Sequence, residues 1–135
     1  MTVRIDLSYD GELHTSAVHP SGAKLATDAP VDNEGRGQAF SPTDLLATAL
    51  GSCMMTVMGI VARRHDWALE GSHVSVEKEM VAEPMRRIGR LGVHFEMAPG
   101  LPEEARPVLE RAAHACPVCK SLGDEVQIDV HFDWP

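Results

Sequence analysis

The chain has 135 residues, with 12 Lys or Arg against 20 Asp or Glu, so its formal net charge at pH 7 is −8. This length suits one globular domain with a sizeable core, and the composition of 44% hydrophobic and 24% charged residues is ordinary for such a domain. The acidic balance and the 4% of aromatic residues argue against a nucleic-acid binder, which needs clustered positive charge and stacking rings.

The amino-terminal part alternates between apolar and polar residues, as strands do. We predict strands over residues 3–9, 12–19 and 24–27, with a hairpin turn at Asp10-Gly11. The following segment, 28–40, is rich in Pro, Gly and Asp and is predicted to be a loop.

A long helix is predicted over residues 41–65. Its start places the hydroxyl of Ser41 at the N-cap, Pro42 at the first helical position and the carboxylate of Asp44 at the third. Apolar residues cover most of its circumference, so we expect burial on more than one side rather than a membrane span. Its glycines, Gly51 and Gly59, predict the close approach of another backbone.

The second half of the chain predicts strands over 71–82 and 86–97, joined by a turn, and a helix from about 102 to 116 that is kinked or divided at Pro107. A short helical turn over 120–122 and a last strand over 126–132 follow. This order predicts a single α+β domain, 1–135, with a largely antiparallel sheet.

Three cysteines cannot all pair within one chain, so we expect no structural disulfide framework. Cys53, inside the long helix, has the position of a small core residue. Cys116 and Cys119 are one helical turn apart, so each thiol can change the pKa of the other. A thioredoxin-like dithiol is disfavoured because helical residues, not a strand, precede the pair. A zinc site built from the three thiols and His114 has only one close Cys pair. The other histidines are scattered, and most are expected to have no chemical role: His14, His19, His65, His73, His94 and His131.

Two motifs together point to a family. The segment 40–53, Phe-Ser-Pro-Thr-Asp-Leu-Leu-Ala-Thr-Ala-Leu-Gly-Ser-Cys, is followed 63 positions after Cys53 by Cys116-Pro117-Val118 and a Lys-Ser-Leu tail. This pattern resembles the OsmC/Ohr family of osmotically induced and organic hydroperoxide resistance proteins, over residues 10 to 133. The resemblance implies a largely antiparallel sheet wrapped around two long central helices in an intertwined homodimer.

The resemblance also implies a chemistry. The protein is expected to be a peroxidase in which Cys53 attacks an organic hydroperoxide and Cys116 resolves the sulfenic acid as a disulfide. No bound cofactor or metal is expected, and an external dithiol would act as reductant. Cys119 stands where the family usually has Ser, as an inert substitution or a third thiol that competes for the sulfenic acid.

Burial disfavours a thiolate, so this chemistry requires a cation beside Cys53. In the family an Arg does this, held by a Glu early in the first helix; here Thr43 stands at the Glu position and Asp44 one place later. Arg36 and Lys24 are the candidate cations, and Asp44 is either a supporting carboxylate or only a helix cap.

The preferred hypothesis is therefore a thiol-dependent reductase of organic hydroperoxides, without nucleic-acid or membrane partners. The absence of a signal-peptide pattern predicts a cytoplasmic location. An apolar pocket lined by four helix residues is expected to favour organic substrates: Leu50, Met54, Val57 and Met58. The alternatives are a small-ligand binding protein that kept the fold without the peroxidase cycle, which the displaced carboxylate favours, and a zinc-held structural protein.

Overall fold

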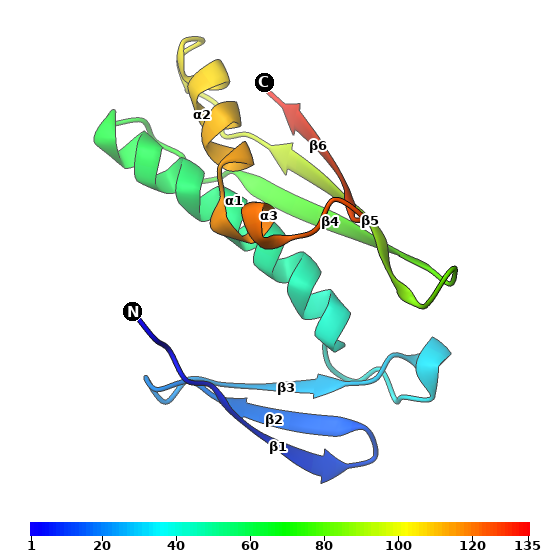
Figure 1. Ribbon diagram of the computed structural model, residues 1–135. Coiled ribbons are helices and arrows are strands. Elements are labelled where there is room, and N and C mark those ends of the chain that lie inside the picture. The colour runs from blue at the N-terminus through cyan, green and yellow to red at the C-terminus, as the bar shows by residue number, and fades with distance from the viewer. The chain divides into compact units, whose positions relative to one another are not determined.

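A computed structural model describes residues 1–135, which form two compact units, Met1–Leu46 and Ala47–Pro135 (Figure 1). Each unit contains a three-stranded sheet. The predicted α+β class is confirmed, with all α-helices following the amino-terminal sheet in the chain.

The amino-terminal sheet is an antiparallel meander of β1 (Asp6–Gly11), β2 (His14–Val18) and β3 (Lys24–Asp28). All three predicted strands are present, although the first begins at Asp6 rather than residue 3. Its apolar side chains share one face, because Ala17 pairs with both Leu7 and Leu25 in register.

The segment after β3 is a loop that contains one short 3-10 helix, η1 (Val31–Asn33). The Asp28 carboxylate anchors this loop by accepting a hydrogen bond from the Gln38 amide at 2.9 Å. Its other oxygen lies 2.6 Å from Nδ1 of His14.

The long helix, α1 (Pro42–Arg64), begins as predicted. The Asp44 amide donates to the Ser41 hydroxyl at 3.1 Å, and the Ser41 amide donates to the Asp44 carboxylate at 2.9 Å. This reciprocal pair is a capping box and satisfies two backbone donors that the first turn leaves without helical partners.

The carboxy-terminal sheet has the order β4 (His73–Val81), β5 (Arg87–Glu96) and β6 (Gln127–Asp133). β4 and β5 are antiparallel, but β6 pairs parallel to β5, so the prediction of a largely antiparallel sheet holds for only part of this unit. A parallel neighbour requires a long crossover, and here the chain crosses through two helices before it re-enters the sheet.

These helices are α2 (Ala105–His114) and α3 (Pro117–Ser121). α2 begins three residues later than predicted, and Pro107 lies in its first turn, where a missing N–H leaves no helical hydrogen bond unmade. With ten residues, α2 is not a second long helix, so this chain contributes one long helix and the expectation of two is not met within it.

α1 and α2 lie on the same side of the β4–β6 sheet (Figure 1). A Cβ placed on Gly51 would lie 2.8 Å from Cγ2 of Val76, so this glycine admits a valine side chain of β4 rather than a backbone. Gly59 has only Leu69 nearby, at 3.9 Å, and the close approach predicted there is not found. The core between helices and sheet includes the fully buried Leu50, Met54, Met58, Leu91, Phe95 and Leu109.

One side of α1 is not covered by this core. By length and composition alone the helix could cross a membrane. Only 33% of its most apolar stretch is buried within this chain. The uncovered side includes Ala49, Ser52, Thr56 and Ile60, which recur at helical spacing.

Candidate functional site

Two cysteines that are distant in sequence meet inside the carboxy-terminal unit. Cys53 projects from the middle of α1 and is half-buried, while Cys116 precedes α3 and is fully buried. The Cys53 thiol lies close enough to Cys116 to affect the pKa of its thiol, and both thiols are free rather than disulfide-linked. The structure therefore brings together the two sulfurs that the sequence analysis singled out as a redox pair.

Cys116 owes its position to a break between two helices. α2 ends at His114, and Cys116 adopts extended dihedrals, φ −65° and ψ 142°, as the N-cap of α3. Pro117 causes the break, because a residue before proline is driven out of the helical region. The sequence predicts this break within two residues, but the short helical turn that follows covers Pro117–Ser121 rather than 120–122.

Cys119 lies one turn into α3 and completes the group of thiols. Its amide donates a hydrogen bond to Sγ of Cys116 at 3.2 Å, and its side chain is half-buried. Of the three cysteines, Cys116 is thus the most buried, and both Cys53 and Cys119 are its neighbours.

Burial raises the pKa of the Cys116 thiol above its usual range. The hydrogen bond with the Cys53 thiol acts in the same direction, and the hydrogen bond from the Cys119 amide opposes it. Cys116 is therefore held as a protonated thiol at neutral pH and is poorly suited to be the first nucleophile.

Arg36 and Asp44, the other predicted site residues, lie in the amino-terminal unit. Arg36 is in the loop after η1, where its exposed guanidinium is 3.5 Å from the carboxylate of Glu12. Asp44 forms the capping box of α1, the simpler of its two predicted roles. A contribution of either residue to the thiol chemistry stays a prediction.

The prediction that four residues of α1 line a substrate pocket is wrong for three of them. Leu50, Met54 and Met58 have no exposed surface and belong to the core, because they face the sheet rather than solvent. Only Val57 of the four predicted residues is half-buried. The apolar character of this helix side thus serves folding.

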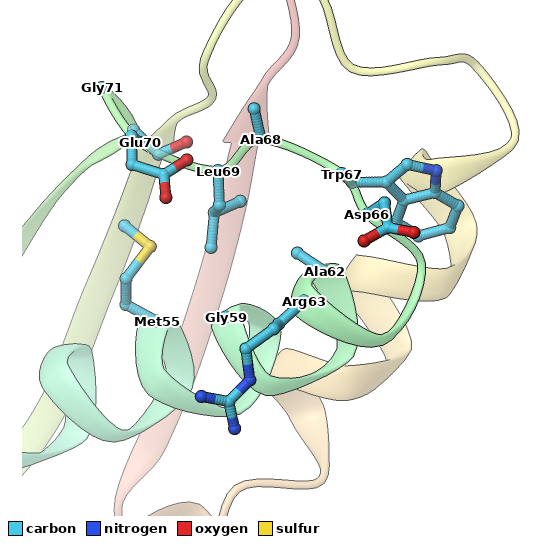
Figure 2. A pocket seen from close by; sticks show the side chains of 11 residues that line it. Met55, Gly59, Ala62, Arg63, Asp66, Trp67, Ala68, Leu69, Glu70 and Gly71 are labelled. Atoms are coloured by element: carbon cyan, nitrogen blue, oxygen red, sulfur yellow. The ribbon is translucent and has the colours of Figure 1, made fainter.

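A surface pocket of about 700 Å³ lies at the carboxyl end of α1 and the loop that follows it. Figure 2 shows Met55 and Leu69 inside it, together with the charged Arg63 and Glu70. No thiol lines it, and Met55 is about 200° around the helix from Cys53. This pocket is therefore separate from the thiol group.

The zinc alternative, a site of the three thiols with His114, is not present as a group of possible ligands within reach of one another. The His114 ring instead packs edge-on against Phe132 of β6, with 6.4 Å between ring centroids. Without that imidazole the set loses its nitrogen ligand.

Comparison with known proteins places this arrangement in a family. The family described as OsmC-like protein matches residues 35–131. A candidate osmotic stress induced and detoxification response protein from Psychrobacter arcticus 273-4 is 40% identical, with a TM-score of 0.91 over 98% of this chain and 96% of that one. A comparison with curated protein sequences found no match.

Two more distant structures share the fold. An organic hydroperoxide resistance protein OsmC from Legionella pneumophila is 21% identical, with a TM-score of 0.78 over 99% of this chain and 98% of that one. The organic hydroperoxide resistance protein OhrB of Bacillus subtilis is 18% identical, with a TM-score of 0.73 over 98% of both chains. The matched residues span both sequence motifs and all three thiols, and the chain therefore belongs to the OsmC-like protein family.

Proposed function

We propose that the protein is a thiol peroxidase that reduces organic hydroperoxides, with Cys53 as the nucleophile and Cys116 as the resolving thiol. The observation that carries this proposal is the proximity of the two free thiols, one half-buried and one fully buried. Family membership supports it, as do the names of the Legionella and Bacillus proteins with the same fold.

The chemistry balances in two steps. The Cys53 thiolate attacks the distal peroxide oxygen, the O–O bond breaks, and the alkoxide leaves with a proton as the alcohol, so that sulfur is oxidised to a sulfenic acid. The Cys116 sulfur then attacks the sulfenic sulfur, and water leaves as the Cys53–Cys116 disulfide forms. Since the two thiols already lie close together, the second step needs little rearrangement of the backbone.

An external dithiol completes the cycle by two thiol–disulfide exchanges, leaving the enzyme reduced and the dithiol oxidised. Cys116 is too deeply buried for a reductant to reach it in place. Cys119 offers a route, because its sulfur can attack Cys116 and release Cys53 before the reductant acts on the half-buried Cys119. A cytoplasmic location, expected from the sequence, would supply such thiols.

The functional form is a homodimer in which a second copy covers the exposed side of α1. Leu7 and Tyr9 of the amino-terminal sheet are 65% and 67% exposed, and Leu25 on the same face is 49% exposed. Apolar surface of this kind on two elements favours burial against another chain. The second long helix implied by the family would then come from the partner copy.

The decisive experiment measures consumption of cumene hydroperoxide with dihydrolipoamide as reductant. Wild type and a Ser52→Ala control should turn over, Cys53→Ser should fall to the rate without protein, and Cys116→Ser should form a sulfenic acid that a cyclic diketone traps. Equal consumption by wild type and Cys53→Ser would show that the chain is not a Cys53 peroxidase.

The second candidate function is small-ligand binding, and the pocket of Figure 2 favours it. Mass spectrometry after one equivalent of hydroperoxide separates the two hypotheses. A peroxidase loses two hydrogen atoms as the Cys53–Cys116 disulfide forms, whereas a binding protein without the redox cycle keeps them.

A further inference from the structure

The outer face of the β4–β6 sheet carries a second group of chemically active side chains, which includes none of the cysteines. Residues alternate along each strand, so the positions next to the buried Val93 and Phe95 point away from the core. On this face His94 of β5 pairs in register with His131 of β6, and Glu96 pairs with Asp133.

Both imidazoles are hydrogen-bonded to the same carboxylate, that of Asp133. Nε2 of His94 lies 2.7 Å from Oδ2 of Asp133, and Nε2 of His131 lies 2.9 Å from Oδ1. The two rings are 5.2 Å apart between centroids and tilted by 58°. One ligand atom from each of the three residues falls within 4.8 Å of the others.

We propose that His94, His131 and Asp133 form a binding site for a divalent transition-metal ion such as Zn²⁺. Two imidazole nitrogens and one carboxylate oxygen are the ligand set that zinc, cobalt and nickel prefer, whereas calcium and magnesium take oxygen alone. On binding, the proton that each Nε2 donates to Asp133 must leave that nitrogen, so the metal-bound neutral ring carries its one proton on Nδ1.

The backbone prearranges this set. His131 and Asp133 are two residues apart on one strand and so share a face, and parallel pairing places His94 beside them without any loop. The side chains are accessible to an ion, with exposed fractions of 42% for His94, 70% for His131 and 57% for Asp133. Glu96 stands beside Asp133 in register, but its carboxylate is not among the ligand atoms that lie within 4.8 Å of one another.

The test is titration of the full chain with Zn²⁺ by calorimetry and with Co²⁺ by absorption. We expect one ion per chain, and His94→Gln, His131→Gln and Asp133→Asn should each weaken binding by about tenfold or more. His19→Gln, which removes an exposed imidazole from the amino-terminal unit, should leave the affinity unchanged. Circular dichroism of each variant confirms that the fold is retained.

Cobalt also separates this site from the thiols. Thiolate ligands give Co²⁺ an intense near-ultraviolet charge-transfer band, whereas imidazole and carboxylate ligands give visible d–d bands alone. Visible bands that disappear in the His94 and His131 variants support the proposal. A thiolate band that survives in those variants, or no binding at all, overturns it.

Discussion

The amide of Cys119 donates a hydrogen bond to the sulfur of Cys116 at 3.2 Å, and the Cys53 thiol lies close enough to Cys116 to raise its pKa. Cys116 therefore has one cysteine neighbour on the long helix and one on its own short helix. In the proposed cycle, Cys116 is the sulfur through which an oxidising equivalent would pass from Cys53 to Cys119.

Replacing Cys119 by Ser should slow the reductive half of the cycle and leave the oxidative half intact. We expect kcat/KM for dihydrolipoamide to fall several-fold, because Cys116 itself is buried, while kcat/KM for cumene hydroperoxide is unchanged. Peptide mapping after one equivalent of hydroperoxide should find a Cys116–Cys119 crosslink in wild type and in the control variant but not in Cys119→Ser. Ser121→Ala, on the same helix, is the control. Equal reductant kinetics with no such crosslink would remove Cys119 from the cycle.

The raised pKa of Cys116 predicts how this thiol reacts with an alkylating agent. In a Cys53→Ser, Cys119→Ser chain, alkylation should be slow at pH 7 and should accelerate only above the range of a free thiol, about pH 8.5, because only the thiolate reacts. The same chain in denaturant provides the reference profile. A rate at pH 7 that matches the denatured chain would contradict the burial argument. The Cys53→Ser substitution also removes one cause of the raised pKa of Cys116, so burial alone must keep the alkylation slow at pH 7.

The sequence predicted features whose causes lie within a few residues. The start of α1 is such a case, because Ser41, Pro42 and Asp44 carry every signal for it. The N-cap role of Cys116 was equally local, since Pro117 alone imposes it. The contact of Cys53 with Cys116 was different: only the family resemblance suggested it, and no periodicity contains it.

Other features depend on how distant segments pair. The direction of β6 is decided by the crossover through α2 and α3, which strand patterns do not encode. For this reason the spacing of His131 and Asp133 could indicate a shared face, but His94 joins them only through the parallel register. The assignment of Leu50 and Met58 to a pocket failed because an apolar helix face is equally suited to a core.

The Asp28 carboxyl predicts a pH dependence of stability. Its hydrogen bond with His14 holds its pKa below the usual range, burial opposes this shift, and the Gln38 amide supports it. Because the folded state favours the ionised form, the stabilisation is complete above about pH 3.9 and is lost as the pH falls through the lower pKa of the folded state.

Asp28→Asn should therefore be less stable than wild type in urea unfolding at pH 6, and the gap should close on acidification as wild type also becomes neutral at this position. Asp124→Asn, in an exposed turn, is the control. If the difference in unfolding free energy between wild type and Asp28→Asn stays constant as the pH falls, then packing, not ionisation, accounts for the lower stability of the variant.

The exposed side of α1 predicts the oligomeric state. Thr56 lies at the centre of that side, and its hydroxyl donates only to the Ser52 carbonyl of its own helix, at 2.8 Å. Thr56→Arg replaces a weak helix former by a better one but places a charge where a second copy would pack, so the dimer should dissociate. Gln127→Arg adds the same side chain on the polar outer face of the sheet and should not affect association.

Light scattering at micromolar concentration should find twice the mass of one chain for wild type and Gln127→Arg, and the mass of one chain for Thr56→Arg. The melting temperature of wild type should also rise with protein concentration, because association stabilises only the folded state. A wild-type chain that is monomeric, with a melting temperature independent of concentration, would leave the exposed apolar residues of α1 and β1 in water and contradict the proposed homodimer. Loss of peroxidase activity together with the dimer in Thr56→Arg would further indicate that the partner copy shelters Cys53 during the reaction.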